Sequence, residues 1–335
     1  MMYQLIEGFG AQLKQALLIG KKQTVTPPRH EIRNVVIAGL GGSGIGGSLV
    51  AEWTTAWLSV PVQVIKSYDI PNYVNQHTLF ITSSFSGGTE ETLAALEKAL
   101  PTGAKVACVT SGGTLMSLAQ DTPFDAVQIP NEAPCPRAFL GYSFVQLMYL
   151  LKHYQLIDDT FEAALEAGVE QIITHREKIQ QEARTMAKAY HGRLPIIYAD
   201  SHFSAVIMRL QQQINENAKQ LCHTHVFPEM NHNELVGWQR EKAHYQHMVV
   251  TMLRSSLDTA RVKIRMDICE PIFKEKAAQF LQVVPQGTTL IEQSLYLIHL
   301  FDWLSFYLAE LNQVDPFPVS IIGHLKSELA KVSTS

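Results

Sequence analysis

A turn rich in hydroxyl groups and glycines follows the short apolar run at residues 79–81. It carries Ser84, Ser86 and Thr89 around the pair Gly87-Gly88, and leucines at helical spacing come after it. We therefore expect a strand-to-helix turn in which backbone N–H groups point inward and the start of the helix adds unpaired donors. Such a turn can bind a phosphate dianion without a lysine or an arginine. An ordinary serine- and glycine-rich loop with a threonine N-cap is the alternative.

A second glycine-rich turn, at residues 39–47, follows the apolar run at 35–38 and matches the dinucleotide fingerprint G-x-G-x-x-G. A dinucleotide also needs an acidic residue at the end of the next strand to bind its ribose, but the strand expected at 62–65 ends in Lys66. Two strand-to-helix turns of one parallel sheet meet at the same edge. We therefore expect one small phosphorylated ligand between the turns and no nicotinamide cofactor.

Strands and helices alternate with short links along most of the chain, which predicts an α/β protein with mostly parallel sheets flanked by helices. Candidate strands lie at 35–38, 62–65, 78–82, 105–109, 126–129, 195–199, 247–252 and 280–284. Candidate helices lie at 3–19, 48–58, 139–153, 290–311 and 319–332, and from Phe203 onward. The segment 259–268 fits either a helix or a strand. The pattern predicts two domains, 1–157 and 158–335, the second of which begins with a charged helical connector.

Composition argues against several classes of protein. The chain has 335 residues, 46% of them hydrophobic, and a net charge of −4 without a basic block, so we expect no nucleic-acid partner. The N-terminus lacks the pattern of a signal peptide, and the apolar stretch at 294–306 is too short and too polar to span a membrane. Four widely spaced cysteines without a C-x-x-C pair fit a reduced, cytoplasmic protein.

The two turns together resemble those of the sugar isomerase (SIS) domain. More specifically, the chain is similar to the bifunctional phosphoglucose/phosphomannose isomerases over nearly its whole length. The further segments that carry this resemblance are Pro136-Arg137, Asn215-Glu216-Asn217, Asn231-His232-Asn233-Glu234, residues 302–309, residues 315–319 and Leu325-Lys326. Two residues depart from the family pattern. Gly88 stands where the family has an asparagine, and Val319 stands near the place where a threonine goes with mannose activity.

The resemblance implies two SIS domains, a homodimer and a small-molecule sugar phosphate as the substrate. It implies that glycines and hydroxyls of both turns bind the phosphate, namely Gly41, Gly42, Ser43, Ser84, Ser86 and Thr89. It also implies that Glu216 is the base and that Arg137 stabilises the negative intermediate. His232 and Lys326 would help to open the sugar ring, with His232 reaching the site across the dimer interface.

These residue types suit an aldose–ketose isomerisation, which moves a proton between C1 and C2 through an enediolate and needs no redox cofactor. Glu216 follows the apolar face of its helix, and burial there would make it a better base. A stiff proline-rich loop at 130–137 would fix the guanidinium of Arg137 beside an oxyanion. A neutral imidazole at His232 can both give and take a proton. The alternatives are a solvated helix-end glutamate, a surface ion pair, a solvated histidine and, at Lys326, an exposed lysine.

A metal site is a further alternative, because His223 and His225 would lie on one face of a strand and residues 229–232 read E-x-x-H. The E-x-x-H pattern needs a helix to converge, whereas Pro228 and the neighbouring asparagines favour a loop. We therefore expect no metal. One of the two strand histidines is expected to stack or to form hydrogen bonds inside its domain.

Together these features predict an isomerase that interconverts glucose 6-phosphate and fructose 6-phosphate, with mannose 6-phosphate as a candidate further substrate. Two other functions remain open. One is a sugar-phosphate sensor without catalysis, which would keep the pocket and act on a partner, although no DNA-binding segment is apparent. The other is an amino-sugar phosphate isomerase.

Overall fold

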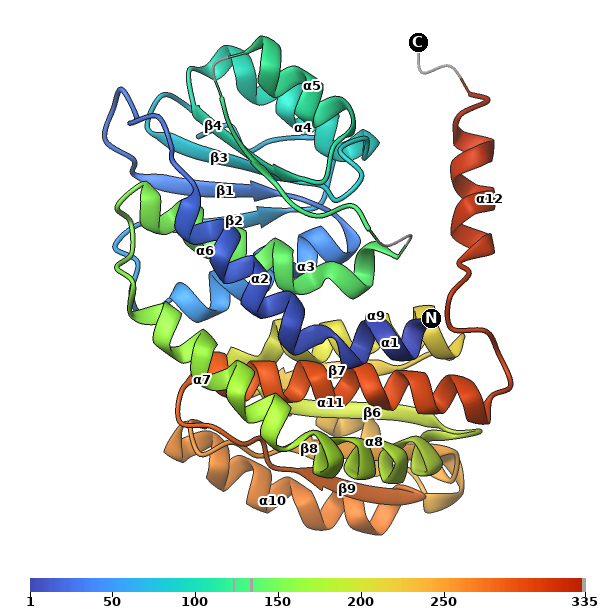
Figure 1. Ribbon diagram of the computed structural model, residues 1–335. Helices are drawn as coiled ribbons and strands as arrows, with labels where there is room; N and C mark the ends of the chain where they lie inside the picture. The colour runs from blue at the N-terminus through green and yellow to red at the C-terminus, as the bar shows by residue number, and fades with distance from the viewer. Residues whose placement is uncertain (123, 133–134, 333–335) are drawn as a thin grey trace.

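The structure is a computed structural model that describes residues 1–122, 124–132 and 135–332. Its chain forms two parallel sheets, one above the other, with helices on both faces of each (Figure 1). The α/β prediction is therefore confirmed. Ala133 and Pro134, which belong to the predicted proline-rich loop, lie outside the described residues.

The first sheet has five parallel strands in the order β2-β1-β3-β4-β5. They are β1 (Asn34–Ala38), β2 (Val62–Ile65), β3 (Thr78–Ser83), β4 (Lys105–Thr110) and β5 (Asp125–Gln128), each within a residue or two of its prediction. Ala38 pairs with Thr82, near the ends of the adjacent strands β1 and β3. The turns that follow these two strands therefore leave the sheet side by side, as the sequence predicts.

The second sheet has four parallel strands in the order β7-β6-β8-β9. They are β6 (Leu194–Asp200), β7 (His223–Phe227), β8 (Met248–Leu253) and β9 (Gln279–Val283). β7 is at the edge of the sheet and β6 is inside it. Most side chains of β7 therefore stay close to solvent. Short 3-10 helices follow β7: η4 (Glu229–His232), η5 (Glu234–Gln239) and η6 (Lys242–Tyr245).

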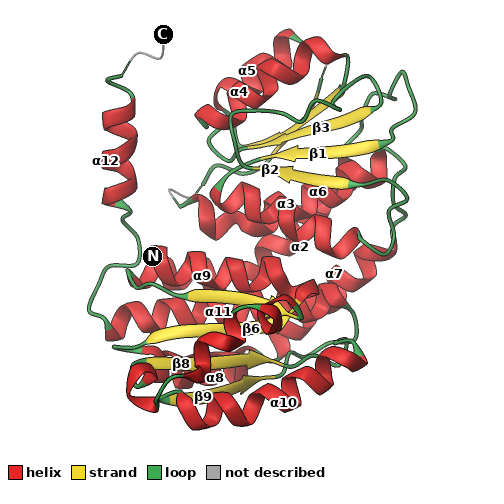
Figure 2. Cartoon of the chain, turned by 180° about the vertical axis from the view of Figure 1, so that it is seen from behind, coloured by secondary structure: helices red, strands yellow, loops and turns green. Residues whose placement is uncertain are grey.

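Helices fill the space between and outside the sheets (Figure 2). The α-helices are α1 (Met2–Glu7), α2 (Phe9–Lys22), α3 (Gly41–Thr54), α4 (Glu90–Ala99), α5 (Gly113–Asp121), α6 (Leu140–His153), α7 (Thr160–Thr174), α8 (Arg176–Tyr190), α9 (Ser204–Ala218), α10 (Ala260–Lys276), α11 (Leu290–Leu311) and α12 (Ser320–Leu329). The ambiguous segment 259–268 is thus helical. Within the described ranges, no helix has both the length and the hydropathy that a membrane crossing requires.

Alternating strand residues divide the apolar interior into one central and two outer clusters. Val35 and Ile37 of β1 face the central cluster, whereas Val36 and Ala38 face the outer cluster under α4. The central cluster contains residues of both sheets and most of α11. The two sheets therefore share one apolar core. Packing in this core fixes the position of the first sheet relative to α9. The second outer cluster lies between the second sheet and α10.

Two predicted helix boundaries are wrong for identifiable reasons. The helix expected at 3–19 is broken at Gly8, which ends α1 and precedes α2. The helix expected at 48–58 begins earlier, at Gly41. Its glycines allow close packing, since a Cβ on Gly44 would lie 2.4 Å from the carbonyl oxygen of Gly39. The low helix propensity of glycine is overridden here by packing against the sheet.

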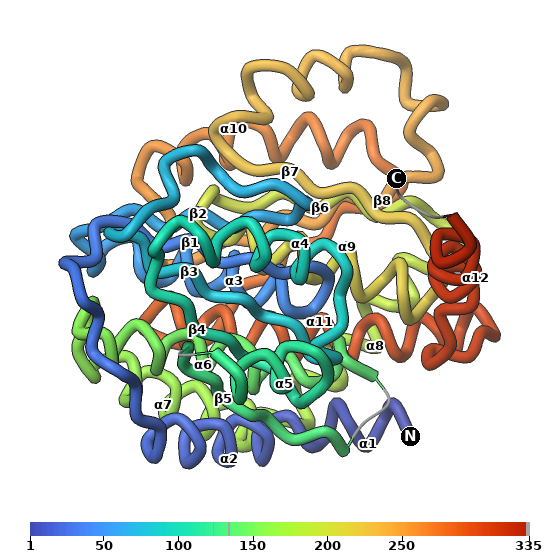
Figure 3. Tube along the Cα trace, turned by 90° about the horizontal axis from the view of Figure 1, so that it is seen from above, coloured from blue at the N-terminus to red at the C-terminus, as the bar shows by residue number. Residues whose placement is uncertain are grey.

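The predicted terminal helix forms as α12 but stands away from the rest of the chain. It lies at the edge of the molecule in the views from the front, from behind and from above (Figures 1, 2 and 3). All of its residues are exposed against the described part of the chain, including Ile321, Leu325 and Leu329. An apolar helix face left in solvent in this way is typical of a surface that another chain covers.

Candidate active site

The first glycine-rich turn becomes the start of α3. Leu40 is its N-cap, and Gly41 has a φ of +52°, a left-handed conformation that favours glycine. A Cβ on Gly42 would lie only 3.5 Å from the Cα atom of Arg137. The first turn of α3, with Gly41, Gly42 and Ser43, therefore lies against the short 3-10 helix η2 (Pro136–Phe139).

The hydroxyl-rich turn after β3 is closed by its own side chains. Oγ of Ser84 and Oγ1 of Thr89 form a hydrogen bond of 2.8 Å, and the backbone N–H of Gly88 donates to Oγ of Ser86 at 3.3 Å. Gly87 has a φ of +66°, and a Cβ there would lie 1.8 Å from the carbonyl oxygen of Gly112. Ser84 is buried, whereas Ser86 and Gly88 are exposed.

The departure at Gly88 has a simple structural consequence. A Cβ at this position would meet no atom of the described residues within 4 Å. An asparagine would therefore fit at this position without displacing its neighbours. Thr89 stands at the N-cap of α4, the position that the ordinary-loop alternative gives it, but its hydroxyl is bonded to Ser84 rather than to the helix.

The structure brings the two turns together with η2. The ring of Phe85, between the two serines, packs edge-on against the ring of Phe139 with centroids 5.5 Å apart. A Cβ on Gly39 would lie 2.9 Å from the carbonyl oxygen of Ser83, so the turns after β1 and β3 are in close contact. One edge of the first sheet is thus surrounded by backbone N–H groups, by hydroxyls and by the backbone of Arg137.

Arg137 is a buried, fully engaged guanidinium rather than a surface charge. Its side chain is 6% exposed. Nε donates to Oδ1 of Asn217 at 2.8 Å, and Nη2 donates to the carbonyl oxygens of Pro316 and Phe317 at 2.6 and 3.1 Å. Nη1 lies 3.3 Å from Oε2 of Glu216. The surface-pair alternative is therefore excluded for Arg137.

Glu216 lies in the last turn of α9, where the sequence predicts it. Ile214 and Leu210, on the apolar face of this helix, are fully buried and hold its position. The carboxylate itself is 26% exposed, so it is less buried than expected. It faces Arg137 on one side and solvent on the other, and this leaves room for a ligand to approach.

A pocket of about 400 Å³ opens beside Glu216. Its other walls come from the end of α9 and from the segment at 318–322, which leads into α12. Val319, the second departure from the family pattern, is one of these lining residues. The pocket thus lies between the end of α9 and the residues that directly follow Pro316 and Phe317, whose carbonyl groups bind Arg137.

Two predicted site residues are not brought to this place. His232 lies in η4 and Lys326 in α12, and both side chains are exposed. Among the described residues, no hydrogen bond or ion pair joins either one to Arg137 or Glu216. Within a single chain, the candidate site therefore consists of the two turns, Arg137 and Glu216.

A buried polar network behind Arg137 was missed by sequence reasoning. Nη2 of Arg209 donates both to the carbonyl oxygen of Arg137, at 2.8 Å, and to Oδ1 of Asp302, at 3.2 Å. Nε2 of Gln213 also donates to Asp302, at 2.6 Å. Burial is the main cause that raises the pKa of Asp302, although Arg209 opposes it. The available signal was an aspartate inside the mostly apolar middle of α11.

A glutamate of the first half of the chain caps α9. Oε1 of Glu52, on α3, accepts a hydrogen bond of 2.7 Å from the backbone N–H of Ala205. Burial raises the pKa of Glu52 from its ordinary value of 4.5 to about 8, while the Ala205 hydrogen bond acts in the opposite direction. This contact ties the helix that begins with the first turn to the helix that ends with Glu216.

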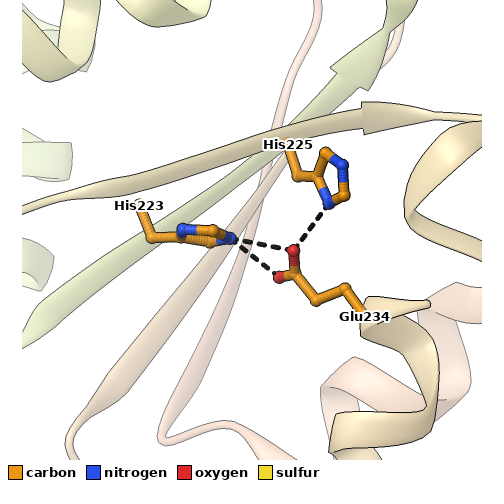
Figure 4. Close-up of side chains that lie close together, drawn as sticks. All are labelled: His223, His225 and Glu234. Carbon is orange, nitrogen blue, oxygen red and sulfur yellow. Dashed lines mark hydrogen bonds and ion pairs between the residues drawn. The ribbon is translucent and has the colours of Figure 1, made fainter.

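The histidines of β7 behave as predicted in one respect. Both His223 and His225 form hydrogen bonds inside their domain, and both bond to the same residue, Glu234 (Figure 4). The predicted loop at 229–232 is instead the short 3-10 helix η4. Glu229 in this helix accepts from Nδ2 of Asn233, at 2.8 Å, so the E-x-x-H pair does not converge on a shared ligand.

Comparisons with known proteins agree with the two-sheet fold. The two-sheet fold is that of the SIS-domain class: a solved structure titled a putative phosphosugar isomerase from Clostridium difficile 630 matches with a TM-score of 0.77 at 15% identity, covering 100% of this chain and 99% of that one. Residues 179–329 match the model of the bacterial phospho-glucose isomerase C-terminal SIS domain.

Sequence relatives identify the family within this class. The chain is 37% identical to a bifunctional phosphoglucose/phosphomannose isomerase of Caldicellulosiruptor bescii, with 99% of both chains covered. It is 32% identical to a protein of the same name from Aquifex aeolicus, with 98% of both covered. The chain belongs to the bifunctional phosphoglucose/phosphomannose isomerase family.

Proposed function

We propose that this protein is an aldose–ketose isomerase that interconverts glucose 6-phosphate and fructose 6-phosphate through an enediolate, and that it also accepts mannose 6-phosphate. The observation that carries the proposal is the buried Arg137 guanidinium 3.3 Å from the Glu216 carboxylate, beside two turns of phosphate-binding type. The relatives that bear this name extend over the full chain.

The phosphate would bind between the two turns. Gly41 and Gly42 supply backbone N–H groups and Ser43 supplies a hydroxyl at the start of α3, and Ser84, Ser86 and Thr89 supply hydroxyls before α4. The positive ends of both helix dipoles favour a dianion at this place. Because the turns contact η2, which carries Arg137, a phosphate bound there would direct the sugar toward Arg137 and Glu216.

Glu216 would act as the base that takes the proton from C2 and returns it to C1. The electron pair of the C–H bond then forms the enediolate, so no electrons leave the substrate and no oxidant is needed. Arg137 would stabilise the negative oxygen, because a guanidinium held by Asn217 and two carbonyl groups cannot turn away or lose its proton.

Ring opening would depend on a second copy of the chain. His232 and Lys326 are exposed, and α12 presents apolar side chains to solvent, which supports a homodimer in which these elements meet a partner copy. His232 would then act across the interface.

We also place the division between the two domains at residues 157 and 158, which is where the chain passes from α6 toward α7.

The direct test is to add fructose 6-phosphate to the purified protein and to follow the products by proton NMR, without a coupling enzyme. We expect glucose 6-phosphate and mannose 6-phosphate to appear at equilibrium ratios, with no added nicotinamide and with EDTA present. Activity that appears only with NAD, or that EDTA abolishes, would contradict the mechanism. Binding of the sugar phosphate without any product would favour the sensor instead.

A further inference from the structure

Two imidazoles and one carboxylate converge at the edge of the second sheet (Figure 4). His223 and His225 lie two residues apart on β7, which places their side chains on the same face of the strand. Glu234 reaches them from η5. Nε2 of His223 lies 3.0 and 2.9 Å from Oε1 and Oε2 of Glu234, and Nδ1 of His225 lies 2.7 Å from Oε2. The three side chains thus offer ligand atoms to a single point.

Hydrogen bonds from buried side chains fix the orientation of the Glu234 carboxylate. The hydroxyl of Tyr198, which is fully buried, donates to Oε1 of Glu234 at 2.5 Å. Nε1 of Trp238 in turn donates to the Tyr198 hydroxyl at 3.0 Å. Outer hydrogen bonds of this kind fix ligating carboxylates in metal sites. They leave Oε2 facing the two imidazoles.

The cluster is open to solvent from one side. The side chains of His223, His225 and Glu234 are 46%, 27% and 25% exposed. Because β7 is an edge strand, the imidazoles do not have to be uncovered before an ion can reach them. The site is therefore accessible in the folded protein while its supporting tyrosine is not.

We propose that His223, His225 and Glu234 bind a Zn²⁺ ion. Imidazole nitrogen and carboxylate oxygen are zinc ligands, at roughly 2.0–2.2 Å from the metal. Ligand atoms around a tetrahedral ion lie a little farther apart than the 2.7–3.0 Å seen between the imidazole nitrogens and the carboxylate oxygens, so the carboxylate needs only a small movement away from each imidazole. Three protein ligands leave a fourth position for water.

A bound ion would also restrain the segment that carries His232. This segment runs from Pro228 to Asn233, between the histidines of β7 and Glu234. Zinc would join its two ends and close it into a short loop, which lowers the freedom of the residues inside. The isomerisation described above gives the ion no part in proton transfer, so the site can be tested without substrate.

Calorimetric titration of the metal-free full chain with Zn²⁺ tests the site, with Co²⁺ as a visible-absorption probe. We expect one zinc per chain, and at least about tenfold weaker binding after His223→Gln or His225→Gln. His247→Gln, which removes an exposed imidazole of the same domain, should bind as the wild type does. Unchanged affinity in the His223→Gln, His225→Gln double variant, or no binding by the wild type, would overturn the proposal.

Amide hydrogen exchange provides a second readout. Zinc should slow exchange of the amides at 229–233 in the wild type and in His247→Gln, and should leave the double variant unchanged. His223 is nearly half exposed, so its replacement is expected to leave the apo melting temperature unaltered, and this is measured first. Equal exchange with and without zinc in the wild type would contradict the restraint of the His232 segment.

Discussion

The guanidinium of Arg137 lies 3.3 Å from the carboxylate of Glu216. Arg137 belongs to η2, beside the first sheet, and Glu216 to the end of α9, beside the second. The pair thus joins two parts of the chain near the place where the two glycine-rich turns, our proposed phosphate site, leave the sheet. Both members depend on α9: Arg137 is held by Asn217 of this helix and by two carbonyl groups, and Glu216 by the buried face of the same helix.

The first prediction concerns this guanidinium. Arg137→Lys keeps the positive charge but cannot reproduce the planar set of contacts, so kcat should fall by about a hundredfold or more. Steady-state kinetics with fructose 6-phosphate measures the change. Arg261→Lys, an exposed arginine of the second half, is the matched control and should keep the wild-type rate. A wild-type kcat in Arg137→Lys would mean that the guanidinium does not act on the intermediate.

The second prediction concerns the phosphate. Ser84→Ala together with Thr89→Ala removes two hydroxyls from the turn without changing its glycines, and KM for fructose 6-phosphate should rise by about tenfold or more. Thr185→Ala, which removes an exposed hydroxyl from α8, should leave KM unchanged. If the double variant keeps both its KM and its inhibition by other sugar phosphates, the phosphate lies elsewhere.

The third prediction concerns His232 and the partner chain. Glu216→Gln and His232→Ala should each be nearly inactive. When the two proteins exchange subunits, each mixed dimer should regain one complete site, and an equal mixture should recover about a quarter of the wild-type rate. Activity of the mixture that stays at the sum of the separate variants would place His232 in the same subunit as Glu216, or outside the site.

The fourth prediction concerns Glu52 and pH. Burial raises the pKa of Glu52 to about 8, above its ordinary value of 4.5, so the folded chain holds this proton more tightly than the unfolded chain. Its contribution to stability is full below pH 4.5 and is lost as the pH rises toward 8. Relative to Glu52→Gln, the wild type should lose on the order of 3 kcal/mol of unfolding free energy between pH 5 and 8. Parallel pH profiles in urea unfolding would contradict the raised pKa.

Local patterns were sufficient to predict the two turns and most of the strands, whereas β7 was anticipated only through its two histidines. An apolar run such as 79–81 is long enough for a buried strand. The hydroxyls and glycines that follow it have few functions at a strand end other than forming a ligand-binding turn. The start of α3 was not predictable in this way, because its glycines are poor helix formers by themselves. Only the close approach to Gly39 and the sheet explains them.

The parts of the site that escaped prediction depend on contacts between distant residues. Arg137 could be singled out as a fixed cation, but its acceptors at Pro316 and Phe317 lie far along the chain. His223 and His225 could be placed on one strand face, whereas the bond to Glu234 required the position of η5. Sequence periodicity carries no information on such pairings.

The central claim is that Glu216 carries the proton between C1 and C2, and isomerisation in deuterium oxide tests it most directly. Wild-type protein and the control Glu241→Gln, an exposed glutamate, should convert fructose 6-phosphate and place deuterium at C2 of the aldose products. Glu216→Gln keeps the shape of the side chain but not its basicity, so kcat should fall by at least about a hundredfold with KM little changed, and C2 deuterium should appear correspondingly slowly. Turnover by Glu216→Gln at the wild-type rate, with deuterium still entering C2, would show that another residue is the base.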